Sequence, residues 1–285
     1  MLNIKTILLP LDLEQTTFPT AIVHEAAALA RRFQAEVLVL HVVKPLTFIG
    51  TSDTVRELVD KAVAAEQERI QKCLGTAMGE LTFKRLVVKG DPAREIARIA
   101  RDERADLIVM PTHGYGPVAR FLLGSVTAKV LHESECPVWT GAHVPDLADG
   151  NFAIRNVLCA IDFTPHSFKA IRWAHEAATE FGAKLTLAHA TPDMEIYGPG
   201  GRHVLTDMQQ ELVDSAKSQI ARIQEKLGLQ TGTYVASGDV ATVISQAAKD
   251  TGADLIVTGS RSLGRRFGTK AYGIIRESPV PVVSI

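Results

Sequence analysis

The residues best suited to chemistry in this sequence form a glycine-rich loop that leads into a helix. Gly114 is followed, after nine residues, by Gly124 and Ser125, where helical periodicity begins. Two glycines let the backbone approach a ligand closely. The first turn of a helix points free N–H groups at an anion, and Ser125 adds a hydroxyl. The spacing therefore predicts a phosphate-binding loop.

This loop differs from the common nucleotide-binding and catalytic motifs. No Gly-Lys-Ser/Thr follows it, as a P-loop requires, and the first turn between strand and helix lacks Gly-x-Gly-x-x-Gly. Ser125 lacks the Gly-x-Ser-x-Gly context and the arranged base of a nucleophile. His113 has no carboxylate partner beside it in the sequence, which disfavours a catalytic base. We therefore predict no catalytic residue.

The elements that must position the loop alternate between strands and helices. Short apolar runs predict strands at 4–9, 36–42, 83–88, 106–110 and 137–140. Helical spacing predicts helices at 22–33, 55–74 and 125–133, and the pair Asp91-Pro92 predicts the start of another. This alternation indicates a doubly wound parallel sheet, whose ligands bind at the carboxyl ends of the strands where the order reverses.

The second half of the chain repeats the first. The string Ala105–Val109 recurs unchanged as Ala253–Val257, 148 residues later, and the strand end at Asp12 pairs with Asp162. A turn-rich stretch, 141–150, separates the halves and is typical of a linker. We therefore predict an α/β protein of two tandem doubly wound domains, residues 1–145 and 146–285, each a five-stranded parallel sheet flanked by helices.

Composition narrows the classes of partner. The 285 residues carry a formal net charge of −1, which gives no field to attract nucleic acid or an anionic membrane. The three cysteines are far apart, so we predict neither a disulfide framework nor a metal site. The first residues lack the features of a signal peptide, and no apolar run approaches the roughly 20 residues of a membrane span. A cytoplasmic protein is expected.

A first strand ending in Asp, then Gly-x-x-Gly, nine residues and Gly-Ser/Thr resembles the pattern of the ATP-binding universal stress proteins, here in tandem. The likeness covers both halves. It implies an adenine nucleotide alpha hydrolase-like fold, with ATP or a related adenine nucleotide as ligand, with or without Mg²⁺. It also implies pairing of the two domains in the manner of a dimer, and allows a homodimer of the whole chain. The nucleotide-binding residues that it implies are Pro10, Leu11, Asp12, Val42, Met110, His113, Gly114, Gly124, Ser125, Val126 and Thr127.

Both halves depart from that family pattern. In the first, Pro111 replaces the leading glycine and removes one N–H donor. In the second, the loop is four residues shorter but gains arginines beside a helix start, which suits an anion by direct pairing. We predict the more intact site in the first domain and a degenerate or altered anion site in the second. The second site would comprise Asp162, Gly259, Arg261, Arg265, Arg266, Gly268 and Thr269.

Simpler interpretations remain for several of these residues. Asp12 and Asp162 suit capping of the first helix of each domain, or of the turn that enters it, as well as ligand contact. His41 and His189 fall at the ends of buried strands and are interpreted as hydrogen-bonded core histidines. The arginines of the second loop fit a solvated turn, and 198–201 fits a flexible crossover as well as a lid.

The leading functional hypothesis is a stress-response protein that binds a nucleotide and thereby regulates a partner. A slow ATPase or phosphotransferase is the enzymatic alternative, although Walker elements and an acid/base pair are missing from the sequence. A scaffold that binds no nucleotide is the third hypothesis.

Overall fold

The chain folds into two compact units. One unit is Asn3–Phe152, and Ala153–Ile285 makes up nearly all of the other. The structure is a computed structural model. It describes residues 2–12, 20–43, 68, 74, 78–79, 81–112, 123–141, 152–193, 201–259 and 269–285, with 201–206 and 269–270 as backbone alone. Each unit is an α/β domain with a parallel sheet, which confirms the predicted fold class.

The first domain contains, in chain order, β1 (Thr6–Pro10), α1 (Thr20–Phe33), β2 (Glu36–Val43), β3 (Phe83–Lys89), α3 (Pro92–Asp102), β4 (Leu107–Pro111), α4 (Ser125–Glu133) and β5 (Val138–Gly141). Its strands pair in parallel in the order β3-β2-β1-β4-β5. The order reverses between β1 and β4, so their carboxyl ends form the ligand-binding edge expected of such a sheet. The helix predicted at 55–74 lies outside the described residues, apart from isolated positions.

The second domain repeats this plan. Its elements are β6 (Asn156–Ala160), α5 (Pro165–Phe181), β7 (Lys184–Thr191), α6 (Gly201–Leu227), β8 (Gly232–Ser237), α7 (Val240–Asp250), β9 (Leu255–Thr258), α8 (Thr269–Glu277) and β10 (Val282–Ser284). The strands are again parallel, in the order β8-β7-β6-β9-β10. The reversal falls between β6 and β9.

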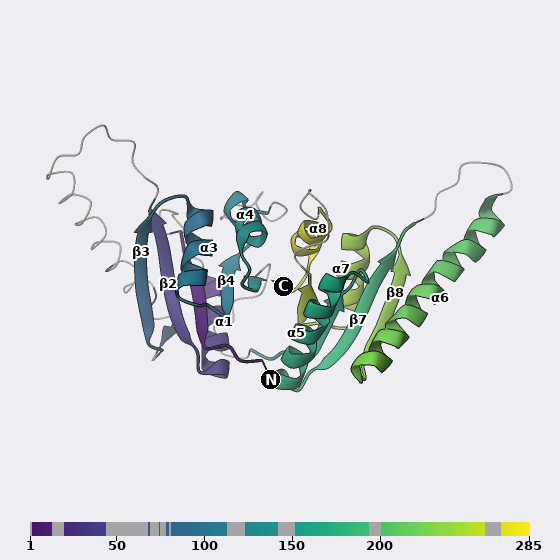
Figure 1. Cartoon of the computed structure of the whole chain (residues 1–285), viewed down its shortest axis with the longest axis horizontal. Coiled ribbons are helices and arrows are strands. Elements are labelled where there is room, and N and C mark those ends of the chain that lie inside the picture. Colours follow the sequence, from purple (N-terminus) through teal and green to yellow (C-terminus); the bar gives the residue numbers. More distant parts are fainter. Residues whose placement is uncertain are drawn as a thin grey trace. The chain divides into compact units, whose positions relative to one another are not determined.

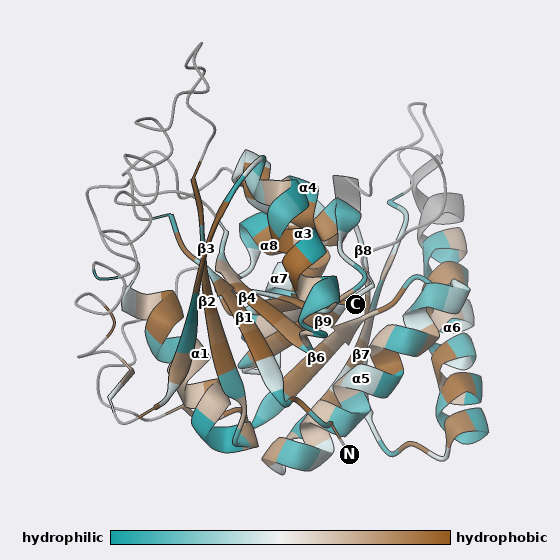
Figure 2. Ribbon diagram, turned by 60° about the vertical axis from the view of Figure 1, so that its left-hand side comes forward, coloured by the Kyte–Doolittle hydropathy of each residue, from teal (hydrophilic) through white to brown (hydrophobic). Residues whose placement is uncertain are grey.

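Apolar strands and amphipathic helices build each core. Ile7, Leu8 and Leu9 of β1 are completely buried, and Figure 2 shows the central strands as the most hydrophobic elements. Right-handed crossovers place α1 on one face of the first sheet and α3 and α4 on the other. Figure 1 shows α3 beside α4, against which it packs. No helix within the described ranges is long and apolar enough to span a bilayer.

Local capping signals act as the sequence predicted. The Asp91 side chain accepts a 3.2 Å hydrogen bond from the backbone N–H of Arg94 at the start of α3, with Pro92 as the first helical residue. Element ends differ from the predictions by one or two residues, which is the usual uncertainty where helices and strands fray.

Candidate functional site

In the first domain, predicted site residues gather at the carboxyl edge of the sheet. β1 ends at Pro10, so Asp12 lies two residues beyond the strand rather than at its end. The N–H of Leu11 still donates to the carbonyl of Leu40 at 2.8 Å, so the pairing with β2 continues one residue beyond β1, up to the residue before Asp12. The residues at this edge are Pro10, Leu11, Asp12, Val42 and Met110.

Helix α4 begins beside this edge. The N–H of Gly124 donates to the carbonyl of Thr112 at 2.8 Å, and the hydroxyl of Thr127 donates to the carbonyl of Pro111 at 3.0 Å. These two bonds tie the helix start to the end of β4. Gly124 is the N-cap and makes no side-chain capping bond. Within the described ranges, no side-chain cap therefore satisfies the first-turn N–H groups, which begin with that of Ser125.

Several predicted residues lie outside the described part of the chain. These are His113 and Gly114 in the first loop, and Arg261, Arg265, Arg266 and Gly268 in the second. Of the remaining second-domain residues, Gly259 directly follows β9 and Thr269 is the first residue of α8. Of the stretch 198–201, only Gly201 is described, as the first residue of α6.

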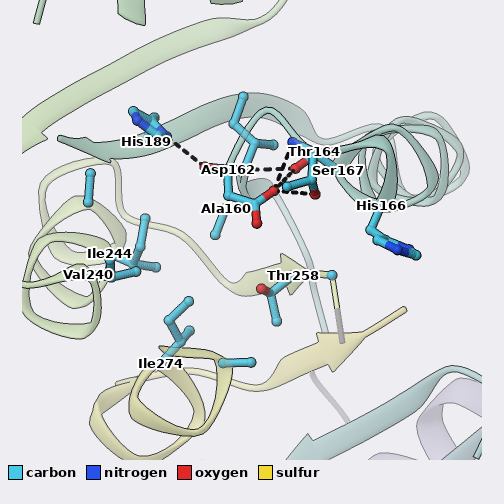
Figure 3. A pocket seen from close by; sticks show the side chains of 14 residues that line it. Ala160, Asp162, Thr164, His166, Ser167, His189, Val240, Ile244, Thr258 and Ile274 are labelled. Atoms are coloured by element: carbon cyan, nitrogen blue, oxygen red, sulfur yellow. Dashed lines mark hydrogen bonds between the residues drawn. The ribbon is translucent and has the colours of Figure 1, made fainter. Parts of the chain in front are cut away.

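A pocket opens at the carboxyl edge of the second sheet (Figure 3). It is formed by the ends of β6, β7 and β9, the turn that enters α5, and the sides of α7 and α8. Its lining residues are Ala160, Ile161, Asp162, Thr164, His166, Ser167, His189, Ala190, Val240, Ile244, Thr258, Gly259, Ala271 and Ile274. In Figure 3 the carboxylate of Asp162 faces the same open space as Thr258, with Ile244 and Ile274 across from it.

The Asp162 carboxylate is fixed by the turn that starts α5. Its Oδ1 accepts hydrogen bonds from the Thr164 N–H at 3.1 Å, the Thr164 hydroxyl at 2.6 Å and the Ser167 hydroxyl at 2.7 Å. The Ser167 hydroxyl in turn accepts from the N–H of Asp162 at 3.0 Å. Partial burial acts to raise the pKa of this carboxyl, but these hydrogen bonds outweigh it and lower the pKa below its ordinary value. Asp162 therefore holds the turn that enters α5, where Thr164 is the N-cap and makes no side-chain capping bond, and it also presents a negative charge to the pocket.

The two strand-end histidines are hydrogen-bonded within the fold. Nδ1 of His41 lies 3.0 Å from the carbonyl of Leu11, and Nδ1 of His189 lies 2.8 Å from that of Ile161. A carbonyl only accepts, so Nδ1 carries the proton in both rings. Phe163 has a φ of 62°, in the left-handed region, and the centroid of its ring lies 4.3 Å from the centroid of the His189 ring. His189 additionally lines the pocket.

The sequence did not single out several residues that shape this pocket. Thr164 and Ser167 orient Asp162, and Thr258 and Ile244 form opposite walls. A signal existed for the first pair, since hydroxyl residues around Pro165 are typical of a helix start. Within the described ranges, no three or more His, Cys, Asp or Glu side chains cluster as metal ligands.

Comparison with known proteins finds the same domain twice. The sequence pattern of the Universal stress protein family matches residues 3–140 and 153–285. A universal stress protein of Mycolicibacterium smegmatis is 26% identical over 279 residues, covering 93% of this chain and 92% of its own. One from Thermus aquaticus is 36% identical over 138 residues, covering 47% of this chain and 96% of its own.

A solved structure shares the whole fold. The crystal structure of a universal stress protein from Archaeoglobus fulgidus superposes with a TM-score of 0.68 and 22% identity, covering 100% of this chain and 97% of the other. A likeness at this identity shows the fold alone.

Proposed function

Because this chain belongs to the universal stress protein family and carries two of its domains, we propose that it is a stress-response regulator whose first domain binds ATP or a related adenine nucleotide. The observation that carries the proposal is the start of α4, where a glycine N-cap without a capping bond lies against the end of β4. We propose a cytoplasmic location as well.

The start of α4 has the chemistry that a phosphate requires. Gly124 contributes no side chain, so its backbone leaves room for a ligand at the N-cap. The uncapped N–H groups of the first turn and the positive end of the helix dipole both favour a negative charge. Ser125 is exposed, so its hydroxyl is accessible as a further donor. These groups support the predicted phosphate side of the site.

The base and ribose would lie at the strand ends. Asp12 and Val42 follow from the family resemblance as the residues beside the adenine and ribose, and both lie at the carboxyl edge of the sheet. Pro111 supplies no N–H, but its carbonyl holds the Thr127 hydroxyl and so fixes the start of α4. The proline thus removes one donor and still helps to position the others.

Calorimetric titration of the full chain with ATP tests the proposal through the substitution Gly124→Asp. Gly124 has φ −61° and ψ 141°, a backbone conformation that any residue adopts. Aspartate at an N-cap accepts from first-turn N–H groups and stabilises the helix. The negative charge of an aspartate at position 124 would also lie where we propose that a phosphate binds. We expect ATP affinity to fall by at least about tenfold, the equivalent of roughly 1.4 kcal/mol.

The matched control is Gly124→Ala, which adds a methyl group without charge. Ser125→Ala should weaken ATP binding more mildly, because it removes one hydroxyl donor. If wild-type protein binds no adenine nucleotide, or if Gly124→Asp binds ATP as well as wild type, the proposed site is wrong.

A further inference from the structure

Among the described residues, the large apolar side chains that are exposed all lie on α6. They are Met208, Leu212 and Leu227, at 43%, 37% and 40% exposure. A single exposed apolar residue is ordinary on a protein surface, but a group on one element indicates an interaction site. Met208 and Leu212 are four residues apart, so they share one face of the helix. Leu227 lies at the other end of α6.

The same face of α6 enters the core farther along the helix. Ala216 and Ile220 continue the four-residue spacing of Met208 and Leu212, and both are buried, at 3% and 0% exposure. α6 packs against β7 and β8. None of the described side chains from 207 to 215 is buried. The apolar row is therefore exposed at its start and buried from Ala216 onward.

The length of α6 explains why the row is exposed at its start. A helix of 27 residues extends about 40 Å, whereas the six residues of β8 extend about 20 Å. Figure 1 shows the start of α6 running past the end of β8. Nε2 of Gln209 donates to the carbonyl of Pro192, the residue after β7, at 3.2 Å. Met208 and Leu212 thus lie at the rim of the sheet, where its strands end.

The charges beside the exposed row are acidic. From residue 207 to 216 the sequence contains Asp207, Glu211 and Asp214, and neither lysine nor arginine. Nζ of Lys217 lies 3.9 Å from Oδ1 of Asp214. Asp207 and Glu211 are exposed, and neither forms an ion pair within the described part of the chain. An apolar row between carboxylates is complementary to a partner that carries apolar and basic side chains.

We propose that the α6 surface formed by Asp207, Met208, Glu211 and Leu212 docks a basic amphipathic helix of a partner protein. The apolar side chains of that helix pack on Met208 and Leu212, and its lysines or arginines pair with Asp207 and Glu211. A second copy of this chain fits less well, because pairing the same row would bring the carboxylates of one chain against those of the other. The surface belongs to the second domain, so this inference goes beyond the nucleotide site proposed for the first.

Fluorescence anisotropy with the full chain and two designed helical peptides tests the proposal. The first peptide combines leucines at helical spacing with lysines, and the second replaces every lysine with glutamate. We expect the lysine peptide to bind at least about tenfold more tightly than the glutamate peptide. Its binding should weaken as salt is added, because exposed charges are screened.

Variants assign the binding to the α6 surface. The double variant Met208→Gln, Leu212→Gln keeps good helix formers and should weaken lysine-peptide binding about tenfold or more. Leu227→Gln, the matched control, removes an exposed leucine from the other end of α6 and should change the binding by less than about twofold. The double variant Asp207→Asn, Glu211→Gln should weaken the binding and reduce its dependence on salt. It carries the test if the glutamine variant does not fold, as judged by circular dichroism.

Three outcomes overturn the proposal. The first is that the lysine peptide does not bind, or binds no more tightly than the glutamate peptide. The second is that Met208→Gln, Leu212→Gln binds the lysine peptide as well as Leu227→Gln does. The third is a wild-type dimer in sedimentation velocity that dissociates in Met208→Gln, Leu212→Gln, because a second copy would then cover the surface. None of these measurements involves ATP, so the proposed function stands or falls separately.

Discussion

The indole Nε1 of Trp139 donates a 2.6 Å hydrogen bond to Oε2 of Glu25, across 114 residues of sequence and inside the core of the first domain. Both side chains are 1% exposed. The carboxylate also lies against β5, since a Cβ built on Gly141 would lie 2.8 Å from Oε1. The pKa of Glu25 is raised to about 7, because the effect of burial outweighs that of the hydrogen bond from Trp139, which lowers the pKa.

The first prediction is that Glu25 makes stability fall as pH rises toward neutrality. The pKa of Glu25 is about 7 in the fold, against 4.5 as its ordinary value. Between these values the folded state holds a proton that the unfolded state has released, so the contribution is complete below pH 4.5 and lost above about 7. A pKa difference of this size corresponds to about 3 kcal/mol. Urea denaturation from pH 4.5 to 8 measures it.

Glu25→Gln removes the titration and keeps an oxygen that accepts from Trp139. Its free energy of unfolding should vary less with pH than that of wild type, and should exceed it at pH 8. Glu36→Gln, an exposed position at the start of β2, is the control for loss of one carboxylate. Identical pH profiles for Glu25→Gln and wild type would show that Glu25 titrates normally.

The second prediction concerns the repeated aspartates, which hold the first strand of each domain. Oδ2 of Asp254 accepts from the N–H groups of Arg155 and Asn156 at 2.7 and 3.0 Å. Asp106 makes the equivalent bonds to residues 5 and 6 at the same distances. Asp254→Ala should cost about 2 kcal/mol, because it leaves two donors without a charged acceptor. Chemical denaturation should show more loss than for Glu211→Ala, an exposed change in α6, and an equal loss contradicts the prediction.

The third prediction is a capping effect at α7. The Asp239 carboxylate accepts from the N–H groups of Ala241 and Thr242 at 3.0 and 3.1 Å. Asp239→Ala should lower stability by about 1 kcal/mol, whereas Asp239→Asn should retain most of it, because asparagine caps nearly as well. Thermal unfolding of the two variants side by side decides the point. Equal melting temperatures would mean that the cap contributes nothing.

The fourth prediction concerns the pocket carboxylate. Ser167→Ala removes the 2.7 Å hydrogen bond to Oδ1 of Asp162 and should move the pKa of that carboxyl up toward its ordinary value. The lowered pKa stabilises the fold at neutral pH, and this contribution is lost as pH falls through it. A ¹³C NMR titration of the Asp162 carboxyl measures the change, with Ser218→Ala on α6 as the control. No change in the pKa would remove Ser167 from its orienting role.

Much of the fold followed from the sequence because its signals are local. Apolar runs gave the strands, Asp91-Pro92 marked the start of α3, and α4 spans the predicted range 125–133. These features depend on residues a few positions apart, which interact in the same way wherever the segment packs. The duplication was equally visible, because it is a property of the residue order itself.

Tertiary structure decided which of those residues act together. The sequence predicted that Asp162 is a ligand-binding or capping residue. Only the geometry of the turn shows that Thr164 and Ser167 hold one of its carboxylate oxygens while the carboxylate faces the pocket. The pairing of Glu25 with Trp139 requires α1 to lie on β5. The pocket of the second domain is lined by residues from three strands, two helices and the turn that enters α5. Such contacts arise from how a helix packs on a sheet, and residue spacing along the chain does not encode that packing.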